Sequence, residues 1–167
     1  MSLILDVTSS VDKQSLLARR SAPASSGAAA SGSRPGSAER SRQLRDLRLS
    51  ILRSLTTGVP GQPRVGLYVL VKDNSSAGER RAVALACAGR AGFEVAETYV
   101  DDTWRSDPVS RFALARAYAA LRRRDIHGLV VASQVDISPI DSVYEQELRR
   151  LWAAGGFLDL ALDETRL

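Results

Sequence analysis

The chain has 167 residues, 44% apolar and 25% charged, which suits one well-packed domain with extensions and excludes two large domains. Cys87 and His127 are its only cysteine and histidine, so we expect no intrachain disulfide, no structural zinc site and no His-based triad. Apolar runs are too short to cross a membrane, and Asp6 interrupts the N-terminal apolar patch without basic residues ahead of it. These features predict a cytoplasmic protein with no metal, no cofactor and no membrane contact.

The net charge of +4 is unevenly distributed along the chain. Residues 1–63 carry nine basic and four acidic side chains, whereas residues 64–167 carry fourteen basic and fifteen acidic ones. With nearly equal numbers of basic and acidic side chains, residues 64–167 offer no basic footprint for nucleic acid. Any DNA contact is therefore expected ahead of residue 64, and we expect it to be weak and independent of base sequence.

The first 38 residues precede any regular pattern. Residues 21–38 consist of Ser, Ala, Gly and Pro with one arginine, so they have no large side chain to bury. Residues 1–20 hold two short apolar patches that are too small to fold alone. We expect residues 1–38 to be a disordered tail and linker, unless the patches dock on another surface.

Residues 39–57 have the pattern of one amphipathic basic helix. We expect Ser37 or Ser41 to cap its start, and Gly58 with Pro60 to end it. Its apolar stripe should pack on the α/β domain or serve self-association, and consists of Leu44, Leu47, Ile51 and Leu55. Its basic face is either solvated or a contact for the DNA backbone, with the candidates Arg40, Arg42, Arg45, Arg48 and Arg53.

From residue 64 onward, strand-like and helix-like segments alternate. Strands are expected at residues 65–71, 94–100, 126–133 and 157–162, and the first and third of them are expected to be buried. Between them, helices are expected at residues 78–90, after Asp107-Pro108, and after a capping box of Ser142 and Glu145. This alternation predicts a three-layer α/β domain over residues 64–167, with a mainly parallel four-stranded sheet and right-handed crossovers.

Helical periodicity also assigns faces to these helices. In the helix of residues 78–90, the side facing the sheet is expected to hold Ala82, Leu85, Ala86 and Gly89. Cys87 is read as a small buried thiol, and Trp152 is expected to pack under the sheet. Arg122, Arg123 and Arg124 are expected to end a helix, where cations complement its dipole.

Ligands of open α/β sheets bind at the carboxyl ends of the strands, so the first loop to consider is residues 72–76. It contains neither G-x-G-x-x-G nor G-x-x-x-x-G-K-[ST], which weakens a nucleotide-binding interpretation. Ser75 and Ser76 are expected to cap the next helix. A small-ligand-binding α/β domain that uses Lys72 stays open as an alternative.

Several segments together resemble the catalytic domain of the serine recombinases, the resolvase and invertase family. They are residues 65–72, Glu79-Arg80-Arg81, residues 91–102, Asp107-Pro108 and residues 128–139, in the family's order and spacing. The resemblance covers about residues 64–167. It implies a resolvase-like fold and, in a working member, DNA strand exchange through a nucleophilic serine.

The residues that would carry this chemistry differ from the family's pattern. The motif Tyr-x-Arg-x-Ser here begins with Tyr68 but has Leu70 in place of the arginine and Lys72 in place of the serine. In the family's Arg-Pro helix start, Asp107 stands in place of the arginine. The two arginines of the family's later Leu-Asp-Arg-Leu-Ser-Arg motif correspond to Asp136 and Pro139. Attack on phosphate needs a hydroxyl nucleophile and cations for the growing charge, so the resemblance implies an inactive member.

Three functional hypotheses follow from the sequence. The first is a catalytically inactive recombinase-like domain that acts by association with a protein partner or with itself. The second is a DNA-binding recombinase or accessory factor in site-specific recombination, for which a shifted register would make Ser75 or Ser76 the nucleophile. The third is the small-ligand-binding domain.

Overall fold

The computed structural model describes residues 36–71, 76–102 and 107–166. Expectations for the N-terminal tail, Lys72 and Ser75 lie outside the described residues. In the described part of the chain, no helix is long and apolar enough to span a membrane.

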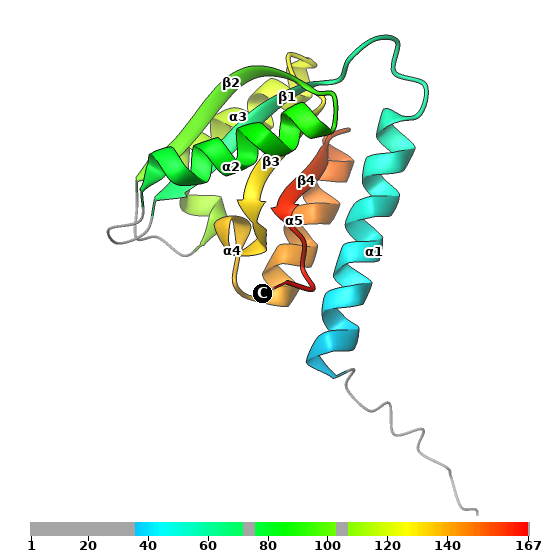
Figure 1. The fold of residues 1–167 in the computed structure, drawn as a ribbon, viewed down its shortest axis with the longest axis vertical. Coiled ribbons are helices and arrows are strands. Elements are labelled where there is room, and N and C mark those ends of the chain that lie inside the picture. Colours follow the sequence, from blue (N-terminus) through cyan, green and yellow to red (C-terminus); the bar gives the residue numbers. More distant parts are fainter. Residues whose placement is uncertain (1–35, 72–75, 103–106, 167) are drawn as a thin grey trace, which may run out of the picture. The chain divides into compact units, whose positions relative to one another are not determined.

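The described chain folds around a sheet of four parallel strands in the order β2-β1-β3-β4 (Figure 1). The strands are β1 (Arg64–Val71), β2 (Glu94–Asp102), β3 (Gly128–Ser133) and β4 (Phe157–Leu162). The helices are α1 (Ser37–Thr56), α2 (Ala77–Arg90), the 3-10 turn η1 (Pro108–Ser110), α3 (Phe112–Arg123), α4 (Gln134–Ile137) and α5 (Asp141–Ala153). The predicted α/β alternation is confirmed, although the third strand begins at Gly128 rather than Ile126.

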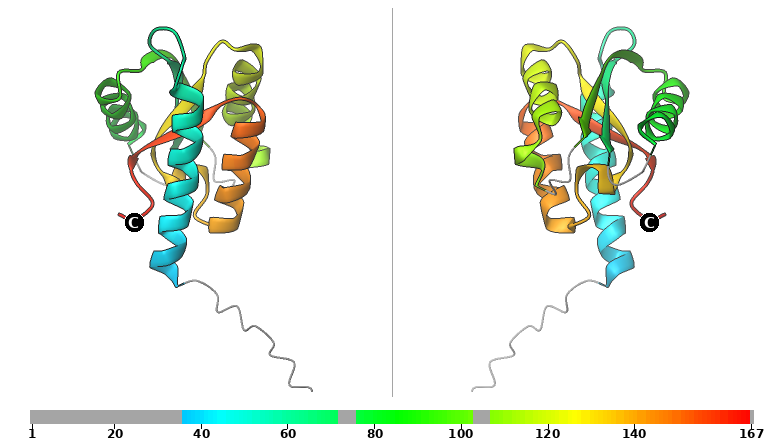
Figure 2. Two further views of the ribbon diagram at one scale, coloured as in Figure 1. Left: turned by 90° about the vertical axis from the view of Figure 1, so that its right-hand side faces the viewer. Right: turned by 90° about the vertical axis from the view of Figure 1, so that its left-hand side faces the viewer.

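Helices cover both faces of the sheet. In Figure 2, α2 lies on one side of the strands, and α3 and α5 lie on the other. The central strands β1 and β3 therefore meet side chains from two layers, and every residue from Val65 to Leu70 and from Gly128 to Ser133 is buried. This explains why both strands read as continuous apolar runs rather than alternating ones.

Helix α1 runs beside α5 and the edge strand β4 (Figure 1). Leu44 and Ile51 are buried in the common core, while Leu47 and Leu55 pack against it partly exposed. The apolar stripe therefore packs within the chain, as one of its two predicted roles required. The predicted serine caps are wrong, since α1 begins at Ser37 after Gly36 with no side-chain cap.

Two predicted helix faces are wrong. The sheet-facing side of α2 holds Ala84, Cys87 and Ala88, and Leu85 is 47% exposed with Ala82, Ala86 and Gly89 on the solvent side. The helix is so rich in small residues that two stripes satisfy helical spacing, and only tertiary contact selects between them. Trp152 is 54% exposed because Tyr144, Leu148 and Leu151 form the face of α5 that packs inward.

Helix starts also depart in part from expectation. Asp107 does cap, because its Oδ1 accepts from the Val109 N–H at 3.0 Å, but the capped element is η1 rather than α3. The capping box on α5 is absent, since that helix begins at Asp141 after Ile140 with no side-chain cap. Glu145 instead forms ion pairs with Arg40 of α1 and Arg149 of its own helix.

Candidate functional site

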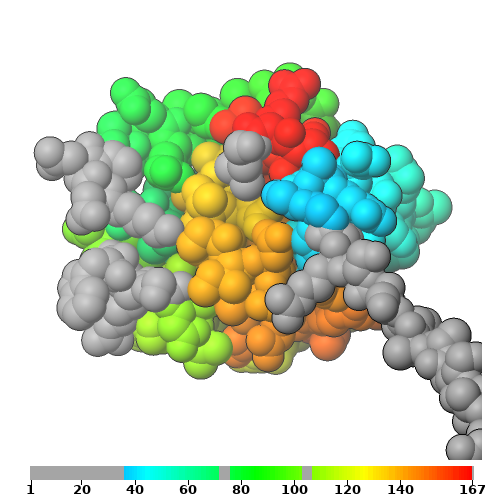
Figure 3. All heavy atoms as spheres, turned by 90° about the horizontal axis from the view of Figure 1, so that it is seen from below, coloured from blue at the N-terminus to red at the C-terminus, as the bar shows by residue number. Residues whose placement is uncertain are grey.

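The strand order β2-β1-β3-β4 has its topological switch point, where the order of the strands reverses, between the neighbouring strands β1 and β3. In open parallel sheets the crevice at such a reversal, at the carboxyl ends of the strands, is where ligands bind. Here that edge is built from the ends of β1, β2 and β3, the start of α2, and the segments of η1 and α4. Figure 3 views the molecule from this side.

Asp101, near the end of β2, is committed to holding α3. Its Oδ1 accepts from the Ala113 N–H at 2.9 Å, and its Oδ2 accepts from the Leu114 N–H at 3.0 Å. The Tyr68 hydroxyl of β1 donates to the same carboxylate at 3.1 Å, and burial raises the pKa of that phenol well above its ordinary value. Tyr68 is therefore a neutral donor bound to a structural carboxylate.

Asp136 is buried in α4. Its Oδ2 accepts from the Ser133 N–H at 3.0 Å, which caps the short helix. Its other oxygen forms an ion pair with Arg80 from the first turn of α2. The cation nearest the start of α2 is thus neutralised by a carboxylate from the neighbouring strand's loop.

Arg111 completes this buried network, and nothing in its local sequence marks it as special. The side chain is almost fully enclosed, and its Nη1 donates to the backbone carbonyls of Asp136 and Ile137 at 2.8 Å each. It fastens the start of α3 to α4 across the edge. The sequence does not single out Arg111, because an arginine between a polar turn and a helix is expected to be solvated.

The other predicted site residues occupy ordinary structural places. Leu70 is fully buried in β1, opposite Asp101 of β2. Ser76 caps α2 as expected, since its Oγ accepts from the Glu79 N–H at 3.2 Å. Pro139 is exposed after α4 and, with Asp107 across the edge, lines a hollow of about 170 Å³.

The net charge of this edge is negative. Its described segments, residues 37–45, 76–80, 101–102, 107–111, 133–141 and 162–166, hold nine carboxylates and six guanidinium groups. At the opposite edge, residues 57–66, 88–95, 121–128 and 152–157 hold five basic and two acidic side chains. The net negative charge of these described segments disfavours contact with a phosphate polymer.

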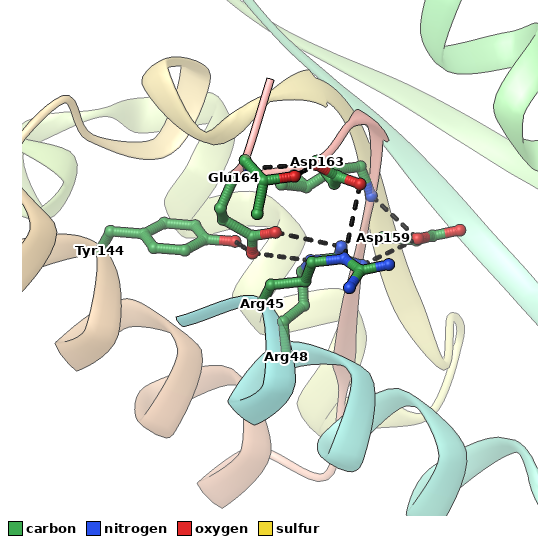
Figure 4. Close-up of polar contacts among 8 residues, drawn as sticks. Arg45, Arg48, Tyr144, Asp159, Asp163 and Glu164 are labelled. Atoms are coloured by element: carbon green, nitrogen blue, oxygen red, sulfur yellow. Dashed lines mark hydrogen bonds and ion pairs between the residues drawn. The ribbon is translucent and has the colours of Figure 1, made fainter. Parts of the chain in front are cut away.

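The arginines of α1 do not form one exposed basic face. Arg48 is only 3% exposed and lies between β4 and the C-terminal segment (Figure 4). Its Nε donates to Glu164 Oε1 at 2.8 Å, and its Nη1 donates to Asp159 Oδ1 at 3.1 Å. The prediction of Arg48 as a DNA contact is therefore wrong, because the helix turns it toward internal carboxylates.

The other α1 arginines divide into two groups. Arg40 pairs with Glu145, and Arg45 pairs with Asp163 at 3.4 Å, so both are engaged by the domain. Arg42 and Arg53 are exposed and stay candidates for contact with a phosphate backbone.

Comparison with known proteins supports the fold. No family model and no curated protein matches the chain. The C-terminal catalytic domain of ISC1926 TnpA, an IS607-like serine recombinase, matches with a TM-score of 0.53 and 13% identity over 60% of this chain and 71% of that one. The N-terminal catalytic domain of TP901-1 integrase matches with a TM-score of 0.53 and 16% identity over 59% and 76%. The domain therefore has the resolvase-like α/β fold that the sequence resemblance implied.

Proposed function

We propose that this chain is a catalytically inactive, resolvase-like domain that acts by associating with another protein. The observation that carries the proposal is the buried network at the carboxyl ends of the strands. Asp101, Asp136 and Arg111 there are occupied by helix caps, an ion pair and backbone carbonyls. These described polar groups bind each other and so stabilise the fold rather than a reacting phosphate.

The chemistry of phosphoryl transfer supports this proposal. Each preorganised donor that stabilises the developing charge contributes about 3–4 kcal/mol to lowering the barrier. Leu70 supplies no such donor, and the carboxylate of Asp136 would oppose the charge that an arginine in its place would neutralise. A DNA phosphate brought to the described segments of this edge would also approach nine carboxylates against six guanidinium groups.

Exposed apolar side chains favour association with protein. Among the described residues, the three most exposed large apolar side chains are Phe112 at 76%, Val109 at 67% and Ile140 at 57%. All three lie at the carboxyl ends of the strands, here called the carboxyl edge. Val109 is in η1, Phe112 begins α3, and Ile140 follows α4. Apolar side chains gathered at one edge are typical of protein interaction sites.

The proposal is tested by incubating the full chain with supercoiled and nicked DNA and separating the products on denaturing gels. We expect neither nicking nor a covalent protein–DNA adduct, with an active serine recombinase as the positive control. An adduct that Ser75→Ala or Ser76→Ala abolishes would overturn the proposal and favour the shifted register instead.

A further inference from the structure

We propose that the hollow between η1 and the beginning of α5 is a docking groove for a cationic segment with apolar side chains, carried by a partner protein. The inference rests on the proposed function, for which it supplies the surface and the chemistry of the partner. We define the η1–α5 groove by Asp107, Pro108, Val109, Pro139, Ile140 and Val143.

The groove has two adjoining parts. The first, of about 170 Å³, lies between Pro108 and the Pro139-Ile140 turn. The second, of about 510 Å³, extends from Val109 along α5 toward Arg150. Asp107 and Val143 line both parts, so they are continuous. An elongated ligand such as a peptide segment can contact both at once.

Apolar contact is the first requirement that the groove places on a partner. Val109 and Ile140 are largely exposed although each lines one part of the groove, and the exposed Phe112 begins α3 three residues after Val109. In Figure 3 the yellow-green segment that contains η1 adjoins the orange beginning of α5. Burying these side chains requires apolar groups on the other protein.

Charge is the second requirement. Asp107 is exposed in the groove, and Asp141 begins the helix that forms one wall. Among the described lining residues the one arginine is Arg150, which lies over the Tyr118 ring at 4.6 Å and pairs with Glu147 at 3.5 Å. The net charge of the described lining is therefore negative, which favours lysine or arginine beside the apolar anchors of an incoming segment and disfavours nucleic acid.

The test uses a synthetic 18-residue amphipathic peptide with leucines on one helical face and lysines on the other. A matched peptide replaces every lysine by glutamate. Binding to the full chain is measured by fluorescence anisotropy at two salt concentrations. We expect the lysine peptide to bind at least tenfold more tightly than the glutamate peptide, with a difference that shrinks at higher salt.

Variants of the chain locate the binding. Val109→Ser with Ile140→Ser should weaken the lysine peptide about tenfold. Leu85→Ser, at an exposed apolar position of α2 outside the groove, is the matched control and should leave binding unchanged. Asp107→Asn keeps a capping side chain, so it should preserve the fold while weakening the lysine peptide a few-fold.

Equal binding of the two peptides, or equal loss with Leu85→Ser and with the groove variant, would overturn the inference. Light scattering adds a second outcome: concentration-dependent mass that Ile140→Ser abolishes would show that the occupant is a second copy of this chain, which also overturns it. A chain that neither cleaves DNA nor binds the peptide would reject the groove and leave the inactive-domain proposal intact.

Discussion

The carboxyl ends and the amino ends of the strands, which we call the carboxyl edge and the amino edge, differ in more than the sign of their charge. At both edges the charge complements the helix dipoles, since carboxylates gather at helix starts and arginines at helix ends. The carboxyl edge adds a buried polar network, represented by Asp136, and the three most exposed large apolar side chains of the described residues, represented by Ile140, while Trp152 is the exposed large apolar side chain at the described amino edge. At the amino edge, Arg122, Arg123 and Arg124 are exposed, as expected for solvated cations at a helix end. The helix dipole therefore explains charge at both edges, whereas the buried polar network of the described residues lies at the carboxyl edge.

The largest expected effect comes from the ion pair that joins α1 to the carboxyl edge. Arg48→Ala would leave Glu164, whose side chain is fully enclosed, as an uncompensated buried charge beside Tyr144. Breaking a buried pair in this way costs about 3–5 kcal/mol of unfolding free energy. Urea denaturation should show this loss. Arg42→Ala, at an exposed position of the same helix, is the control and should change stability by less than about 0.5 kcal/mol.

A smaller loss is expected from the cap of α3. Asp101→Ala removes the acceptor of the Ala113 and Leu114 N–H groups and of the Tyr68 hydroxyl, and should cost about 2 kcal/mol. Asp102→Ala, one residue later and exposed, is the matched control. Equal destabilisation by the two variants in thermal unfolding would show that Asp101 is not a structural cap and would reopen this edge as a reactive site.

A still smaller effect concerns acid pH. Hydrogen bonds from Arg149 and Arg40 lower the pKa of Glu145 below its ordinary value of 4.5. A carboxyl whose folded pKa is depressed stabilises the fold above its unfolded pKa and loses that contribution as pH falls through the folded value. Near pH 7, Glu145→Gln should therefore lower the free energy of unfolding by less than about 1 kcal/mol, measured as a slightly lower thermal midpoint. The difference from the unmodified chain should begin to shrink as the pH falls below 4.5 and should disappear once the pH lies below the lowered pKa of Glu145. A difference that does not shrink on acidification would show that Glu145 acts through packing.

The sequence predicts the sheet well because the evidence for it is local. Val65 to Leu70 are apolar without interruption, and helical and turn signals separate each strand from the next. The polar network is not predictable in this way, because Arg48 and Glu164 are 116 positions apart in the chain. Arg48 looks identical to its exposed neighbours until the packing of α1 on β4 decides which arginine faces inward.

The candidate site was foreseen in position but not in its contacts. The motif comparison drew attention to Asp136 and Asp107, and both lie at the carboxyl edge. It could not reveal that Arg80 pairs with Asp136, or that Arg111 is buried on backbone carbonyls. Such partners depend on how loops from three strands meet, which periodicity does not encode.

The smallest expected effect concerns residual DNA binding, which sharpens the contrast between the acidic edge and the rest of the surface. Of the five arginines of α1 that the sequence offers as DNA contacts, Arg48 is buried, and Arg40 and Arg45 are paired to carboxylates. Arg42 and Arg53 are the exposed ones. We expect Arg42→Ala with Arg53→Ala to weaken DNA binding in mobility shift only a few-fold and to lower the slope of log K against log salt by about two, because each phosphate contact contributes about one unit. Arg122→Ala with Arg123→Ala tests the basic amino edge by the same measurement. A larger loss of DNA affinity with that second pair would show that the amino edge, rather than α1, contacts the DNA backbone. Binding that persists with both pairs removed, and that depends on base sequence, would contradict the view that charge governs DNA contact.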